Sequence, residues 1–270
     1  MEQTFDAKAL KERFNPEGSL LRRQQNRMTE MLVFIDGVCR KHNIKYWLCS
    51  GTLLGCIRHG GYIPWDDDLD IEMLREDYLK LLKVLPSELP DNYALQTNET
   101  DPGYFFTYAK LRDKRSTLSE VNHYDRIFRY KGIYIDIFPL EKNPIFLHWV
   151  SCRLHGFTYN VMNNPRNSDE QAFKKVRRIY RFCDKFAFPI LRALSHLWPS
   201  HILHYSFGIP YSDTRYPEDI FPLTTAKFED YDMPVPHDSH MCLKRKFGDY
   251  MRLPNIDELH LHVADMTIED

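Results

Sequence analysis

The sequence predicts an α+β protein, with an α/β-type core of mixed sheet and flanking helices, and with a helical insert. Three observations lead to this prediction. Apolar residues recur at helical spacing over 20–42. Acidic and apolar residues alternate with the period of a strand over 68–73, and a β-branched run covers 132–139. Helix and strand signals in the same part of the chain favour a sheet covered by helices.

The first half of the chain holds further elements between these three. Short apolar or alternating runs predict strands over 46–49, 93–97 and 105–112. Helical spacing predicts helices over 53–58 and 76–85, and we expect Pro86 to end the second one.

The pattern changes after Pro144. Long helical patterns with basic and aromatic residues extend over 145–205, strand-like sequence returns near 226–236, and a helix is expected over 240–247. These changes predict three parts of the chain: a core over 1–142, a helical insert over 143–224, and a C-terminal segment, 225–270, that returns to the core.

Charge and cysteine usage narrow the functional class. The 270 residues include 36 Lys and Arg against 38 Asp and Glu, which gives a net charge of −2. Such a chain has no global basic field, so we expect no nucleic-acid partner. None of the six cysteines forms a C-x-x-C pair, and the N-terminus lacks an apolar secretory region. We therefore expect a cytoplasmic protein with reduced thiols.

An acidic strand is the first candidate site. If 68–73 is a strand, Asp68, Asp70 and Glu72 share one face, and the intervening apolar residues face a core. Neighbouring carboxylates repel each other, and a divalent cation such as Mg²⁺ or Mn²⁺ relieves that repulsion. The alternative is a solvated acidic turn. An EF-hand loop is excluded, because Ile71 and Asp77 occupy the positions that need Gly and Glu.

Asp136 favours the metal site over the acidic turn. It lies between Ile135 and Ile137 in an otherwise apolar strand, where a carboxylate is costly to bury unless it is paired or bound to metal. A salt bridge to an arginine is the alternative. A D-x-D strand followed by a strand with a single Asp is the three-carboxylate pattern of two-metal phosphoryl-transfer sites.

Glycine and basic residues provide candidate phosphate ligands. Ser50-Gly51-Thr52 joins a strand to a helix, where free N–H groups attract an anion, although such a turn is often only turn chemistry. Lys110 and Arg112 share a strand face with Tyr108 and would neutralise a diphosphate, unless they form a solvated basic edge. Arg58 would reach a phosphate or cap helix carbonyls.

Basic and aromatic residues interleave over 170–192, where acidic residues are scarce. This pattern suits a face that meets an anionic membrane or a lipid-linked acceptor. A solvated helix face packed against the core is the alternative interpretation.

Several segments together resemble the LicD family of the nucleotidyltransferase superfamily. The segments that carry the resemblance are 46–55, 57–59, 61–71, 110–112, 132–140 and 247–251. The match spans most of 30–140 and resumes near 226–254, whereas the insert carries little of it. The family includes bacterial phosphocholine transferases and is similar to the animal fukutin-type ribitol-phosphate transferases.

The resemblance implies a nucleotidyltransferase-like fold and a specific reaction. A phospho-alcohol, with phosphocholine the leading candidate, would move from a CDP-linked donor to a sugar hydroxyl of a glycan or lipid-linked glycan, releasing CMP. It also implies Mg²⁺ or Mn²⁺ as cofactor. Asp68 and Asp70 would hold the metal, and Asp136 would complete the site and take the acceptor proton. The implied substrate-binding residues are Ser50, Gly51, Thr52, Arg58, Lys110 and Arg112.

Three other functions stay open at this point. A metal-dependent glycosyltransferase would use D-x-D to hold a nucleotide sugar, without needing the Gly51 turn or Asp136. A non-catalytic binding or scaffold protein with the same fold would show no metal dependence. An ordinary nucleotidyltransferase would leave the nucleotide on the acceptor.

Overall fold

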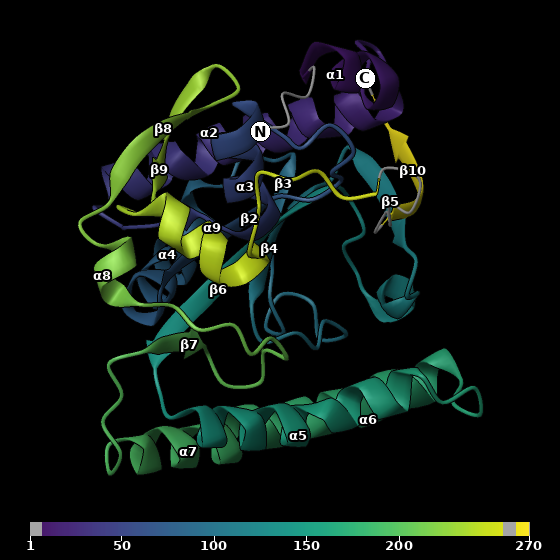
Figure 1. The fold of residues 1–270 in the computed structure, drawn as a ribbon. Helices are drawn as coiled ribbons and strands as arrows, with labels where there is room; N and C mark the ends of the chain where they lie inside the picture. The colour runs from purple at the N-terminus through teal and green to yellow at the C-terminus, as the bar shows by residue number, and fades with distance from the viewer. Residues whose placement is uncertain (1–6, 256–262, 270) are drawn as a thin grey trace.

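A six-stranded mixed sheet runs through the centre of the computed structural model, which describes residues 7–255 and 263–269 (Figure 1). The strands follow the order β1-β2-β6-β4-β3, and β7 pairs with the far end of β6. Only β2 and β6 run parallel; the other pairs are antiparallel. The strands are β1 (Trp47–Leu48), β2 (Asp70–Leu74), β3 (Tyr93–Gln96), β4 (Ala109–Asp113), β6 (Tyr134–Lys142) and β7 (Leu203–Tyr205).

Helices α2 (Leu20–Lys41), α3 (Ser50–His59) and α4 (Arg75–Glu88) pack on one side of the sheet. Ser19 caps α2 by accepting a hydrogen bond from the backbone N–H of Arg22. The buried stripe of α2 meets apolar strand residues in the larger core, which contains Met28, Met31, Leu32, Ile35, Ile71, Leu111, Ile135 and Ile137.

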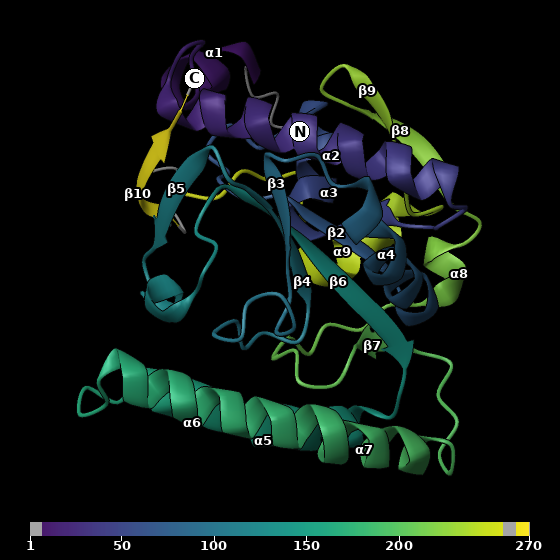
Figure 2. The ribbon, with the colours of Figure 1, turned by 180° about the vertical axis from the view of Figure 1, so that it is seen from behind.

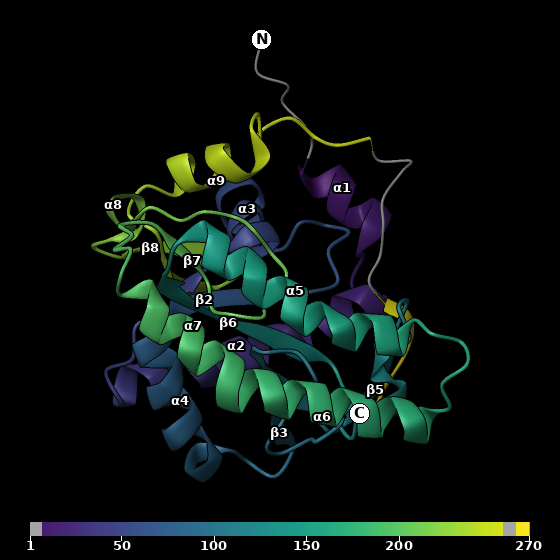
Figure 3. The same ribbon diagram turned by 90° about the horizontal axis from the view of Figure 1, so that it is seen from below.

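A layer of helices lies on the other side of the sheet, as Figures 2 and 3 show from behind and from below. It contains α5 (Ile145–Met162), α6 (Asp169–Phe182), a single π turn η2 (Cys183–Ala187) and α7 (Phe188–Ser195). A capping box between Ser168 and Gln171 starts α6. A second, strongly aromatic core joins this layer to the sheet through Tyr104, Phe105, Phe106, Phe138, Met162 and Val176.

Two small two-stranded sheets and several short helices lie around the central sheet. Strand β5 (Ser116–Glu120) pairs with β10 (Val263–Ile268), and β8 (Thr224–Phe228) pairs with β9 (Tyr231–Val235). The short helices are α1 (Ala7–Phe14), the 3₁₀ turn η1 (Tyr124–Ile127), α8 (Pro217–Ile220) and α9 (Ser239–Phe247). Within the described ranges, no helix combines the length and the apolar character needed to cross a membrane.

The predicted α+β class with a mixed sheet and flanking helices is confirmed. Leu69, Ile71 and Met73 all face the core, as the alternation predicts. Several predicted boundaries differ from the structure. Helix α3 begins at Ser50, strand β2 begins only at Asp70, and the strand expected over 105–112 is formed only from Ala109.

Pro86 does not end α4, which continues to Glu88. The free-energy cost of Pro86 inside α4 is limited, because proline removes a single N–H donor close to the end of the helix. The expected helical insert over 143–224 contains α5, α6 and α7, and also β7, which adds to the central sheet at Leu140–Lys142.

Candidate active site

A cavity of about 660 Å³ opens between the sheet and the helical layer. Strand alternation explains its position: Asp136 shares a face of β6 with Phe138, and that face turns toward the aromatic core. The cavity is bounded by the start of α3, by β2, β4 and β6, and by Tyr159 of α5. Its polar lining is Ser50, Asp66, Asp68, Asp70, Lys110, Glu120, Asn122, Asp136 and Lys246.

Three predicted carboxylates, those of Asp68, Asp70 and Asp136, open on this cavity. Asp70 and Asp136 are direct partners in the parallel β2–β6 register. Asp68 precedes β2 instead of lying on it, so the predicted shared strand face does not include it. The third member of that face, Glu72, is buried further along β2 and bonds Trp47 and Arg215.

The acidic loop before β2 is held by polar residues of other elements. Gln24 and Gln25 of α2 donate to the backbone carbonyls of Asp67 and Asp66, at 2.6 and 2.9 Å. The hydroxyl of Thr52 accepts from the backbone N–H of Asp70 at 2.9 Å. Thr52 therefore fixes the start of β2, and it does not line the cavity with Ser50 and Gly51.

The neighbouring carboxylates repel one another, which makes it harder for each of them to ionise. Burial, followed by the charges of Asp68, Asp136 and Asp66, raises the pKa of Asp70 well above its usual value. This electrostatic conflict is the environment in which a bound cation is most stabilising, and carboxylate oxygens are the ligands that Mg²⁺ and Mn²⁺ prefer.

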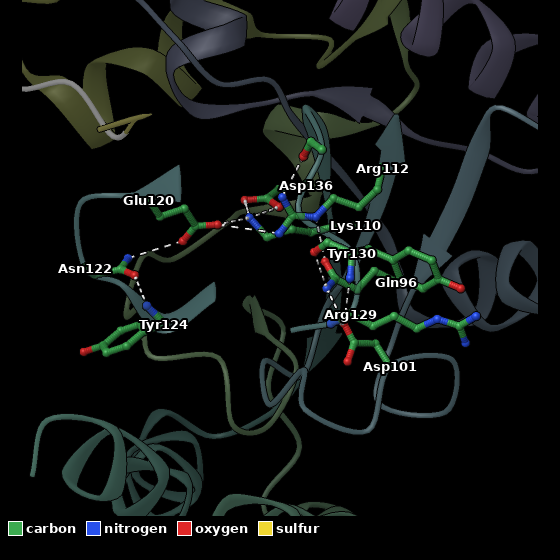
Figure 4. A network of polar contacts seen from close by, with 11 residues as sticks. Gln96, Asp101, Lys110, Arg112, Glu120, Asn122, Tyr124, Arg129, Tyr130 and Asp136 are labelled. Carbon is green, nitrogen blue, oxygen red and sulfur yellow. Dashed lines mark hydrogen bonds and ion pairs between the residues drawn. The ribbon is translucent and has the colours of Figure 1, made fainter. Parts of the chain in front are cut away.

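A buried charge network surrounds Asp136 (Figure 4). Lys110 Nζ lies 2.9 Å from Asp136 Oδ1 and 3.8 Å from Glu120 Oε1, and 3.3 Å from the ring centroid of Tyr134. Burial raises the pKa of the Asp136 carboxyl to about 6 despite the opposing charge of Lys110. The expected salt-bridge alternative for Asp136 is therefore present, with lysine in place of arginine.

Arg112 shares the strand face of Lys110, as predicted, but it does not line the cavity. It donates to Gln96 Oε1 at 2.7 Å and to the carbonyl of Gly132 at 2.8 Å. Both basic side chains are buried, so the solvated basic edge is excluded. Arg112 also lies 3.6 Å from Glu120, which places it behind the charges that face the cavity.

Arg58 lies outside the cavity lining. Its Nη1 donates to the backbone carbonyl of Tyr250 at 2.7 Å and to that of Arg252 at 3.4 Å. Between the two predicted roles, the structure shows carbonyl binding, and the carbonyls belong to the segment after α9 rather than to its own helix.

A metal ion fits the donor chemistry but not the present arrangement of side chains. Within 7–255 and 263–269, no three His, Cys, Asp or Glu side chains are grouped so that they could hold a metal ion. Lys110 pairs with Asp136, which is the third of the predicted carboxylate ligands. The predicted Mg²⁺ or Mn²⁺ site stays a prediction, with Asp68 and Asp70 as its best-placed ligands.

Sequence reasoning identified Tyr108 but missed the rest of an aromatic wall and two charged groups. Phe106, Tyr124, Tyr159 and Tyr211 line the cavity with Tyr108, and so do Glu120 and Lys246. The aromatic run at 104–108 was a visible signal, whereas Tyr159 and Tyr211 come from the region expected as an insert. Only the fold brings them to the carboxylates.

We expect Asp136→Asn to leave the metal-free protein at least as stable as the wild type near pH 7. Because the pKa of Asp136 is raised on folding, the stability that this group contributes is present below its unfolded value and is lost as pH rises through about 6. Urea unfolding of both proteins should show the mutant's advantage near pH 7 and a smaller one near pH 4.

Lys110→Met is the matched control for this measurement. It leaves the buried carboxylates of Asp136 and Glu120 without their lysine, and we expect a loss of about 3–5 kcal/mol. If Asp136→Asn cost as much as Lys110→Met, Asp136 would be a structural anchor and the electrostatic account of the site would be wrong.

Comparisons with known proteins show the family of the chain. The family model described as LicD/FKTN/FKRP, nucleotidyltransferase domain, matches residues 43–192. The lipopolysaccharide cholinephosphotransferase LicD of Haemophilus influenzae is 28% identical over 260 residues, which cover 90% of this chain and 95% of that protein. The human ribitol 5-phosphate transferase FKRP is 42% identical over 50 residues, 18% of this chain and 10% of that protein.

Mannosyltransferase regulator 4 of Saccharomyces cerevisiae is 26% identical over 156 residues, 55% of this chain and 13% of that protein. The family model covers the start of α3, the acidic loop and strands β2, β4 and β6, which together form the carboxylate side of the cavity. The match with the Haemophilus protein extends over nearly the whole chain. The chain therefore belongs to the LicD family.

Proposed function

We propose that this protein transfers a phosphorylated alcohol from a CDP-linked donor to a sugar hydroxyl of a cell-surface glycan precursor, releasing CMP. The observation that carries the proposal is the register of Asp70 opposite Asp136, beside Lys110, in one cavity. Phosphoryl transfer asks a protein mainly for positioning and charge neutralisation. The name of the Haemophilus relative, a cholinephosphotransferase, supports phosphocholine as the group that moves.

The start of α3 is suited to the donor phosphates. Ser50 and Gly51 line the cavity, and no side chain caps this helix end, so its first N–H groups are available to an anion. A Cβ atom at Gly51 would lie 3.0 Å from Asp66 Oδ2, so the Asp66 carboxylate lies directly beside this helix end. A diphosphate binding here would need a cation to offset the Asp66 charge.

Asp136 is the candidate base for the acceptor. A carboxyl with a pKa of about 6 is ionised near neutral pH and still basic enough to accept a proton. The acceptor O–H would give its proton to Asp136 while its oxygen bonds to the phosphorus of the alcohol phosphate. The bond from that phosphorus to CMP breaks, and CMP leaves with the electron pair.

Mg²⁺ or Mn²⁺ is proposed as the cofactor, and Asp68 and Asp70 would hold it. When bound, the ion would neutralise phosphate charge that builds up during transfer. Lys110 supplies a second positive charge from β4, held in place by Glu120 and the ring of Tyr134.

The aromatic wall favours a cationic alcohol. Trimethylammonium groups bind to the faces of aromatic rings, and rings from Phe106, Tyr108, Tyr124, Tyr159 and Tyr211 line this cavity. A polyol such as ribitol would instead need many hydrogen-bonding partners. We therefore propose choline ahead of ribitol or glycerol as the transferred alcohol.

We expect Tyr211→Leu to raise the KM for CDP-choline about tenfold and to leave that for CDP-glycerol nearly unchanged, because it removes a ring face that attracts the cation. The side chain is 46% exposed, so folding should be little affected. Tyr211→Phe keeps the ring and should behave as the wild type. Equal effects of Tyr211→Leu on both donors would contradict a cation-binding role.

A donor screen tests the proposal as a whole. Purified protein with Mn²⁺ would be incubated with CDP-choline, CDP-ethanolamine, CDP-glycerol or CDP-ribitol, and CMP release would be followed. Release from one CDP-alcohol supports the proposal. Activity only with UDP-sugars would favour a glycosyltransferase. No turnover and no metal-dependent thermal stabilisation would favour a binding or scaffold protein.

A further inference from the structure

Helix α5 exposes large apolar side chains while it buries several polar ones. The stripe that it buries against the protein carries His148, Ser151, His155 and Thr158 between the apolar Leu147 and Met162. Its exposed stripe carries Phe146, Trp149, Val150 and Phe157 beside Arg153 and Asn160, and Trp149 is 59% exposed and Phe157 56%. A helix that meets water on its outer side shows the opposite arrangement. Solvation therefore does not explain the outer face of α5.

A second apolar stripe runs along the neighbouring helices. Phe182, Phe186, Ile190 and Leu194 recur every four residues through α6, the π turn and α7, and all are exposed. Leu197 and Trp198 extend the stripe beyond α7. The ring of Trp198 lies 5.4 Å from that of Phe146, so the two stripes meet at this end of the layer.

An apolar hollow joins the stripes further along. It has a volume of about 690 Å³ and is lined by Leu154, Phe157, Val161, Ile179 and Phe182. Lys175 and Arg178 contribute to the same lining. Helices α5 and α6–α7 lie side by side as one layer in Figure 3, on the side of the molecule away from α2. The stripes, Trp198 and this hollow form what we call the outer face.

The outer face holds an unusual share of the exposed apolar side chains. Of the 18 large hydrophobic side chains that are exposed in the described part of the chain, ten lie between Phe146 and Trp198. Apolar side chains gathered in this way mark an interaction surface, whereas single exposed ones need no explanation.

The charge around the outer face indicates which kind of partner would cover it. Helix α6 and the π turn carry six exposed basic residues, against three acidic ones, of which Glu170 is paired with Lys174. The six are Lys174, Lys175, Arg177, Arg178, Arg181 and Lys185. Apolar side chains beside basic ones, with tryptophans among them, match the interface of an anionic bilayer.

We propose that the outer face docks the protein on an anionic lipid bilayer, with α5 and α6–α7 lying in the plane of the interface. The apolar stripes enter the boundary between headgroups and acyl chains, and the basic residues meet lipid phosphates. The surface is larger than 170–192, the segment that the sequence suggested, because α5 supplies four of its ten exposed apolar side chains. The inference stands on the helix faces and does not require the proposed reaction.

Docking would bring the candidate active site close to the bilayer. Phe157 lies on the outer face, and Tyr159, two residues later on α5, lines the catalytic cavity. A lipid-linked acceptor held in the same bilayer would therefore reach the cavity around one helix.

Vesicle flotation tests the proposal. Full-length protein would be mixed with vesicles of phosphatidylcholine alone, or of an equal mixture of phosphatidylcholine and phosphatidylglycerol. We expect binding to the anionic vesicles, weakened by salt. The double variant Trp149→Glu/Phe186→Glu should bind at least about tenfold more weakly, because it places charge inside the apolar boundary. Lys175→Gln/Arg178→Gln should lose binding only in part.

Leu20→Glu/Tyr231→Glu is the matched control, since it adds the same charge at exposed apolar positions of α2 and β9. It should bind like the wild type. Absence of wild-type binding to anionic vesicles, or equal loss in both double variants, would overturn the proposal. So would a lipid-free dimer, seen by analytical ultracentrifugation, that Trp149→Glu/Phe186→Glu dissociates, because the occupant would then be a second copy of the chain.

Discussion

Asp70→Asn is expected to lower CMP release from CDP-choline by at least about a hundredfold, the scale of removing one preorganised electrostatic group. Asp70 faces Asp136 across the β2–β6 pair, and its backbone N–H donates to the hydroxyl of Thr52 at the start of the strand. Steady-state assays with saturating Mn²⁺ measure the effect. Near-normal turnover in the mutant would remove Asp70 from the site.

Asp67→Asn is the matched control for this substitution. Asp67 is buried one position before Asp68, it accepts from the backbone N–H of Val263, and it does not line the cavity. An asparagine oxygen can still accept that bond, so activity should be retained.

Asp70→Asn should not destabilise the metal-free protein near pH 7. Because folding raises the pKa of Asp70, its ionisation weakens the folded state as pH rises above the unfolded value. The mutant avoids this loss, and its advantage should fade as pH drops toward the unfolded value of about 4. A strongly destabilised mutant would show that Asp70 is needed for folding.

Glu72→Gln is expected to lower the free energy of unfolding by about 3–5 kcal/mol. Arg215 binds Glu72 with two bonds, Nη2 to Oε1 at 2.7 Å and Nε to Oε2 at 3.2 Å. Trp47 donates a third bond at 3.1 Å. The glutamate side chain is 1% exposed, so the mutation leaves the Arg215 charge largely buried with a weaker partner.

The Glu72–Arg215 pair also connects the loop before Arg215, which carries Tyr211, to strand β2, which carries Asp70. Guanidinium unfolding measures the loss. Glu170→Gln is the control, because Glu170 and its partner Lys174 are both exposed on α6 and their pair should contribute no more than about 1 kcal/mol. Similar losses in the two mutants would contradict the assignment of a buried anchor.

Much of the core was predictable because its elements carry their own periodicity. The stripe of α2 and the alternation around Asp70 are local patterns that tertiary contacts reinforce. The predicted ends of helices and strands were less accurate where the prediction relied on a single residue. Pro86 was expected to end α4, but near a helix end its missing donor costs little.

Roles of site residues were harder to predict than their strand faces. Lys110 and Arg112 do share a face, but only the β4–β6 register and the position of Glu120 decide that Lys110 meets the cavity and Arg112 lies behind it. Arg58 binds carbonyls that follow α9, almost 200 positions away in the sequence. Contacts at such separation leave no local signal.

Helix α5 shows a further limit of the sequence. Its periodicity reports a helix with two unlike faces, but not which face is buried. Only packing against the sheet reveals that His155 points inward and Phe157 outward. The proposed lipid-docking surface could therefore be identified only after the fold was known.

The mass of the product tests the central claim most directly. A glycan-precursor extract would be incubated with the protein, Mn²⁺ and CDP-choline deuterated in its methyl groups, and the glycan would be analysed by mass spectrometry. We predict a gain of one deuterated phosphocholine, with one CMP released for each. A cytidine nucleotide on the glycan would contradict the account, and so would labelling that occurs only from a UDP-sugar.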